Sequence, residues 1–67
     1  MSELGFWQTL KALNLVCETD GGGPDGWCCH LATRENFLAG KDEVQAYGHT
    51  RGQARKEALR QWQEKQR

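Results

Sequence analysis

The sequence lacks a charge excess, a long apolar run and a regular cysteine pattern. Its nine basic and nine acidic side chains give a formal net charge of zero, whereas nucleic-acid-binding domains usually carry a basic excess. The first seventeen residues contain neither a basic leader nor a long apolar run, and Glu3 stands where a signal peptide would carry Lys or Arg. We therefore expect no export and no membrane-spanning segment.

Cysteine is too sparse and too irregularly spaced for a disulfide framework. There are three cysteines, an odd number, and Cys28 and Cys29 are adjacent. Small secreted domains instead carry even sets of spaced cysteines, whereas the cytoplasm keeps thiols reduced. We expect free thiols and a cytoplasmic location.

The length of the chain limits it to one thin core. A protein of 67 residues buries only roughly 60% of the surface that its unfolded chain exposes. With 37% apolar and 27% charged residues, the composition is that of a folded domain. We expect a single domain over residues 1–67, of marginal stability unless a partner or a second copy supports it, so a homodimer stays open.

The first part of the chain predicts a helix and then a strand. Apolar residues recur at spacings of three and four, which places them on one stripe of a helix over residues 3–13. Residues 15–19 are typical of a short strand. Residues 20–26 are rich in glycine and contain Pro24, which predicts a turn or loop. The stripe comprises Leu4, Phe6, Trp7, Leu10 and Leu13.

Two further strands are expected, at residues 27–33 and ending at residues 44–47. The first of them alternates between two partly apolar faces, as a strand does. The connection over residues 33–40 leaves two interpretations open. It can turn directly into the third strand, or it can form a single capped helical turn that ends at Gly40.

The last helix has the clearest start in the sequence. Thr50 followed by Gln53 is a capping box, in which each side chain satisfies a free backbone donor at the helix start. Ala54, Ala58 and Trp62 then recur four residues apart and form the expected buried stripe. Together the elements predict an α+β domain of order α-β-β-β-α, with two helices packed on one face of a three-stranded antiparallel sheet.

The zero net charge hides a division between the two parts of the chain. Residues 51–67 carry six basic and two acidic side chains, a net charge of +4. Residues 1–50 carry three basic and seven acidic side chains, a net charge of −4. A phosphate-binding surface is therefore expected on the last helix.

Two local motifs resemble those of the double-stranded RNA-binding domains. Gly23-Pro24-Asp25-Gly26 lies where that family has a Gly-Pro loop before its second strand. Thr50-Arg51-Gly52-Gln53-Ala54-Arg55-Lys56-Glu57-Ala58-Leu59 lies where its last helix opens with a basic stretch. Gly52 and Gly26 replace a lysine and a histidine of the family's pattern. The resemblance covers nearly the whole chain and implies recognition of the shape of duplex RNA across its minor grooves.

The basic residues at the start of the last helix are the predicted phosphate contacts. Arg51 and Arg55 lie in its first turns, where free backbone N–H groups and the positive end of the helix dipole favour an anion. Lys56 and Arg60 are expected to support them. The predicted function is therefore binding to the nucleic-acid backbone, with duplex RNA favoured over DNA.

A second resemblance uses some of the same residues. Gly26-Trp27-Cys28-Cys29, with Tyr47-Gly48-His49-Thr50 before a basic helix, is similar to the arm-binding domains at the N-terminus of tyrosine recombinases. The sheet of those domains lies in the major groove of DNA. Acidic residues that would approach phosphate oppose this mode here: Glu18, Asp20, Asp25, Glu35, Asp42 and Glu43.

No metal site, cofactor site or catalytic site is predicted. Cysteine and histidine are numerous enough for zinc, but the adjacent Cys28 and Cys29 would point to opposite faces of a strand. A Cys/His nucleophilic pair needs an orienting pocket, for which so short a chain has little room. We expect packing thiols, no cofactor and no enzymatic activity.

Protein recognition is the alternative function. Phe6, Trp7 and Trp62 are expected in the core because of their helical spacing. Trp27 directly follows the glycine-rich segment, and an exposed tryptophan on a small domain often anchors an interface. With His30 on the same strand and an acidic face, Trp27 would serve a protein-interaction module or a small inhibitor of a host factor.

Overall fold

Within residues 3–24 and 26–66, which the computed structural model describes, three strands and three helices follow one another. They are α1 (Glu3–Ala12), β1 (Leu15–Gly23), β2 (Gly26–Thr33), α2 (Arg34–Leu38), β3 (Val44–Gly48) and α3 (Arg51–Lys65). The strands form one antiparallel sheet in the order β1-β2-β3. The predicted α+β class and three-stranded antiparallel sheet are confirmed, with a short third helix between β2 and β3.

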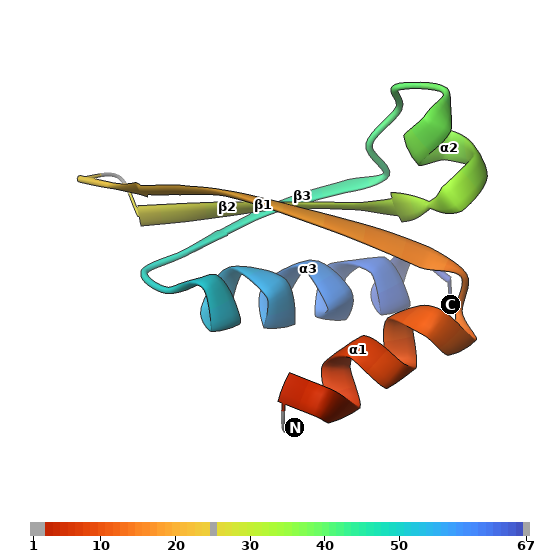
Figure 1. Ribbon diagram of the computed structural model, residues 1–67, viewed down its shortest axis with the longest axis horizontal. Helices are drawn as coiled ribbons and strands as arrows, with labels where there is room; N and C mark the ends of the chain where they lie inside the picture. The colour runs from red at the N-terminus through yellow and green to blue at the C-terminus, as the bar shows by residue number, and fades with distance from the viewer. Residues whose placement is uncertain (1–2, 25, 67) are drawn as a thin grey trace.

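The sheet separates the two long helices from the short one. Figure 1 shows α1 and α3 beneath one face of the sheet, while α2 stands on the other side at one end. α1 packs mainly on β1, whereas α3 packs on β3 and β2. The expected packing of two helices on one face is therefore confirmed.

The core lies between the inner face of the sheet and the two long helices. Cys29 and Leu31 of β2 are fully buried there, because residues two apart on a strand share a face. Ala54 and Ala58 are also fully buried, and their small side chains let α3 lie close to the sheet. The other members of the core are Phe6, Leu10, Leu15, Val44, Ala46 and Leu59.

The apolar stripe of α1 is only partly buried. Phe6 and Leu10 belong to the core, but Leu4, Trp7 and Leu13 are 68%, 41% and 37% exposed. A helix that lies on the edge strand β1 turns only one side to the sheet, so the outer part of its stripe faces solvent. The expectation that Trp7 lies in the core is therefore wrong. None of the described helices is long and apolar enough to cross a membrane.

The glycine-rich segment belongs largely to the β1–β2 hairpin. β1 continues to Gly23, so the turn predicted over residues 20–26 is wrong in its first half. Gly21 has a φ of +137°, and a Cβ there would lie 2.4 Å from the carbonyl oxygen of Gly26. Only glycine permits this close approach of the two strands. The pairing of β1 with β2 therefore continues after Asp20, with a bulge between Gly21 and Gly23.

The connection between β2 and β3 contains a capped helical turn. Thr33 caps α2, since its side-chain oxygen accepts a hydrogen bond from the Asn36 N–H at 3.4 Å. The Glu43 carboxylate accepts the Thr33 N–H at 2.6 Å, and this hydrogen bond lowers the pKa of Glu43. Of the two interpretations of residues 33–40, the helical turn is confirmed. The full order is therefore α-β-β-α-β-α rather than α-β-β-β-α.

The last helix begins where the capping box predicts. Thr50 Oγ1 accepts the Gln53 N–H at 3.1 Å, and Gln53 Oε1 accepts the His49 N–H at 2.9 Å. The return bond reaches the residue before the cap rather than Thr50 itself. These two bonds hold the junction between β3 and α3 in place.

We expect Thr50→Ala to lower the free energy of unfolding by about 1 kcal/mol, because the Gln53 N–H loses its side-chain acceptor. Chemical denaturation followed by circular dichroism measures the change. Thr50→Ser retains the hydroxyl group and is the control. An alanine variant as stable as the original chain would contradict the assigned start of α3.

The same junction has no room for a side chain at Gly48. A Cβ there would lie 2.7 Å from the Ala54 nitrogen and 2.7 Å from the Gln53 Cβ. We expect Gly48→Ala to destabilise the domain by about 1–3 kcal/mol through overpacking, measured as a lower denaturation midpoint. Gly23→Ala is the matched control, since nothing lies within 4 Å of its added Cβ. A larger effect at Gly23 than at Gly48 would show that the junction is not closely packed.

Candidate nucleic-acid interface

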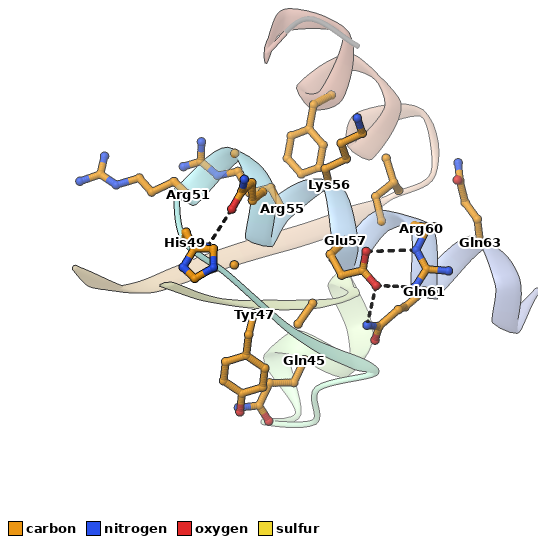
Figure 2. A pocket seen from close by; sticks show the side chains of 16 residues that line it. Gln45, Tyr47, His49, Arg51, Arg55, Lys56, Glu57, Arg60, Gln61 and Gln63 are labelled. Carbon is orange, nitrogen blue, oxygen red and sulfur yellow. Dashed lines mark hydrogen bonds and ion pairs between the residues drawn. The ribbon is translucent and has the colours of Figure 1, made fainter. Parts of the chain in front are cut away.

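A hollow runs along α3, next to β3. Figure 2 shows the side chains that line it. The four basic residues predicted as phosphate contacts all belong to this lining: Arg51, Arg55, Lys56 and Arg60. They differ in what their charged ends contact, and these contacts decide which of them a ligand can reach.

Arg51 is exposed at the start of α3 and lies against Trp27. Its guanidinium carbon is 4.5 Å from the centre of the Trp27 ring. A cation over an aromatic face is attracted by about 0.5–1 kcal/mol at an exposed site. The Arg51 guanidinium forms no hydrogen bond or ion pair within the described residues, and a guanidinium over a ring keeps N–H donors that a phosphate can accept from.

Arg55 is partly buried and turned toward the fold. Its guanidinium carbon is 5.0 Å from the centre of the Trp7 ring, and its Nε donates a hydrogen bond to Thr19 Oγ1 at 3.4 Å. The side chain therefore joins α3 to α1 and β1. Arg55 adds positive charge to the hollow, but its contacts with Trp7 and Thr19 indicate a mainly structural role.

Lys56 and Arg60 differ in their local charge balance. Lys56 is exposed, whereas Arg60 forms ion pairs with Glu57 and, at 2.7 Å, with Glu64. Hydrogen bonds from Arg60 lower the pKa of Glu57 to about 2. The charge of Arg60 is therefore less available to a phosphate than that of Lys56. Arg67, the last basic residue of this end of the chain, lies outside the described residues.

The base of the β1–β2 hairpin adjoins the start of α3. Trp27 pairs with Gly48 across β2 and β3, and a Cβ on Gly26 would lie 2.6 Å from the Gly48 carbonyl oxygen. Figure 1 shows β1 and β2 extending past β3 at the end of the sheet where α3 begins. The two motifs of the RNA-binding resemblance thus lie at one end of the molecule, although Asp25 is outside the described residues.

The outer face of the sheet carries acidic groups around His30. The Nδ1 of His30 is 2.9 Å from Oδ2 of Asp42, and its Nε2 is 3.9 Å from Oδ2 of Asp20. Trp27 and His30 are three residues apart on β2, so these two candidate interface residues lie on opposite faces of the sheet. The carboxylates also disfavour the approach of phosphate that a recombinase-like use of the sheet requires.

The cysteines lie on both sides of the sheet. Cys29 is fully buried on the core face, where its sulfur is 2.9 Å from that of Cys17. Cys28 lies on the outer face, with its Sγ 3.6 Å from Nε2 of His30. All three thiols are free. Among the described residues, no three His, Cys, Asp or Glu side chains are placed to hold a metal ion.

Sequence reasoning missed two contributors to this surface. His49 is exposed and lines the hollow near Arg51. Its position directly before the helix cap was a usable signal, because side chains there can reach an anion bound at the helix start. Trp7 holds Arg55 rather than filling the core. No local pattern connects two residues so far apart in the chain.

Comparisons with known proteins add no assignment. No protein family, no curated protein and no solved structure matches the chain. The two resemblances drawn from local motifs therefore stay predictions, and the functional argument depends on the geometry of α3 and the hairpin.

We expect Arg55→Gln to lower the free energy of unfolding by about 1 kcal/mol, because the contacts with Trp7 and Thr19 are lost. Lys56→Gln removes the same charge from the next residue and is the matched control. It should change the stability by no more than about 0.5 kcal/mol, since Lys56 is exposed. Equal effects of the two changes on the denaturation midpoint would contradict a structural role for Arg55.

Proposed function

We propose that this domain binds the sugar-phosphate backbone of nucleic acid, preferably duplex RNA, through the first turns of α3. The observation that carries the proposal is that three exposed residues, His49, Arg51 and Lys56, line one hollow along the first two turns of this 15-residue helix. The helix dipole and the first backbone N–H groups favour an anion at the same place. Such contacts position a protein on a backbone without reading bases.

Gly52 supports close access to the helix start. The family pattern has a lysine at this position, so the chain loses one positive charge there. In return, the first turn carries no side chain at Gly52, and a Cβ would come near only Thr50 Oγ1, at 3.9 Å. A phosphate oxygen can therefore approach the backbone N–H groups of the first turn directly.

The position of the hairpin favours a duplex as the ligand. It extends from the same end of the molecule as the start of α3, so the two can meet a duplex at separate points along its backbone (Figure 1). The wide, shallow minor groove of A-form RNA admits such a hairpin, whereas its narrow major groove presents phosphates to the helix. Both long helices on one face of the sheet agree with the fold that the RNA-binding resemblance implies.

Titrations against duplex RNA, duplex DNA and single strands at several salt concentrations test the proposal. We expect the tightest binding to duplex RNA and a linear fall of log K with log salt. Replacing Arg51 and Lys56 together by Gln should weaken binding to all sequences alike and flatten that slope by about two units. Both side chains are exposed, so the circular dichroism spectrum should stay unchanged.

Arg60→Gln is the matched control for this experiment. It removes a positive charge from the same helix, but that charge is already paired with Glu57 and Glu64. We expect this variant to change the slope of log K against log salt by much less than half of the change that the Arg51 and Lys56 double variant causes. No affinity for any nucleic acid at low salt, where the electrostatic attraction is largest, would contradict the proposal.

Protein recognition has weaker support from the same geometry. Trp27, its candidate anchor, packs partly against the core and is covered by Arg51. The exposed aromatic residue on the outer face of the sheet, the face that carries the acidic groups, is instead Tyr47, which is 66% exposed. An anchor for a protein partner on that side would therefore be Tyr47, which pairs with Cys28 on the outer face of the sheet, rather than Trp27.

A further inference from the structure

Two of the three cysteines face each other inside the fold. Cys17 of β1 and Cys29 of β2 lie on the core face of neighbouring strands, with their sulfur atoms 2.9 Å apart. A disulfide bond is about 2.05 Å long, so bond formation needs an approach of less than about 1 Å. Cys28, the residue before Cys29, points to the opposite face of the sheet and lies beside His30.

The surroundings make the two thiols chemically unequal. The hydrogen bond from Cys29 lowers the pKa of Cys17 to about 7, and the Thr19 hydroxyl and the Arg55 charge act in the same direction against the effect of burial. The same contact, together with burial, raises the pKa of Cys29. Near neutral pH, Cys17 is therefore the better nucleophile and Cys29 keeps its proton.

The two sulfurs also differ in their access to solvent. Cys17 is half-buried and contributes to the lining of a surface hollow between α1 and β1, where Lys11 and Arg34 add positive charge. Cys29 has no exposed surface. A small reagent can thus reach Cys17 first, and Cys29 is the thiol placed to react with the product.

We propose that Cys17 and Cys29 form a redox-active dithiol, a modification site that hydrogen peroxide converts into an intramolecular disulfide. The Cys17 thiolate attacks one peroxide oxygen, the O–O bond breaks, and the released hydroxide takes up a proton to become water. The Cys29 sulfur then attacks the sulfur of the resulting sulfenic acid. The S–O bond breaks, its hydroxyl leaves as water with the Cys29 proton, and the two thiols have given two electrons to one peroxide.

Intact-mass measurement of the full chain after treatment with hydrogen peroxide tests the proposal without any nucleic acid. We expect the loss of two hydrogen atoms from the monomer and a single remaining alkylatable thiol. Peptide mapping should assign that thiol to Cys28, and dithiothreitol should restore all three thiols. Cys28→Ser is the matched control and should lose two hydrogen atoms as the original chain does.

The partner cysteines are tested separately. Cys17→Ser should abolish the loss of two hydrogen atoms, and because Cys17 is only half-buried this variant should keep its circular dichroism spectrum. In Cys29→Ala, if it folds, Cys17 should accumulate as a sulfenic acid that dimedone traps. The proposal is overturned if Cys28 oxidises before Cys17, if the disulfide joins two chains, or if Cys28→Ser prevents the change.

Discussion

The close packing of α3 against the sheet sets the place of most other elements. Ala54 and Ala58 are fully buried in one cluster with Cys29 and Leu31 of the central strand. Because these alanines are small, the helix comes so close to β3 that the junction has room only for glycine at position 48. A chain of this length has a single thin core, so the rest of the fold depends on this contact.

The same packing keeps the opposite charges of the chain apart. Arg51, Lys56 and Arg60 are exposed on α3, whereas Asp20 and Asp42 lie around His30 on the outer face of the sheet. At physiological ionic strength, exposed charges separated by more than about 8 Å are largely screened from each other. A net charge of zero is therefore compatible with a local surface that attracts phosphate.

Two contacts between cations and aromatic rings couple the candidate interface to the fold. Arg51 lies over Trp27 at the base of the hairpin, and Arg55 lies over Trp7 of α1. A side chain held in this way loses less conformational entropy when it binds a ligand. Arg55 also lies beside Thr19 and the Cys17 thiol, so the redox-active pair and the helix start share one set of neighbours.

Local chemistry in the sequence determined the capped start of the last helix, the alternation along β2 and the α+β class. Those features depend on residues close together in the chain, such as Thr50 with Gln53. The pairing of Arg60 with Glu57 and Glu64 is also local, since these residues are three and four positions apart on one helix. The tertiary structure alone decided that Arg55 is turned inward and that Trp7 is exposed. It also decided that Cys17 meets Cys29, because strand register joins segments that no local spacing relates. Pairing between distant residues is a property of the folded chain, since it arises only when strands and helices pack against one another.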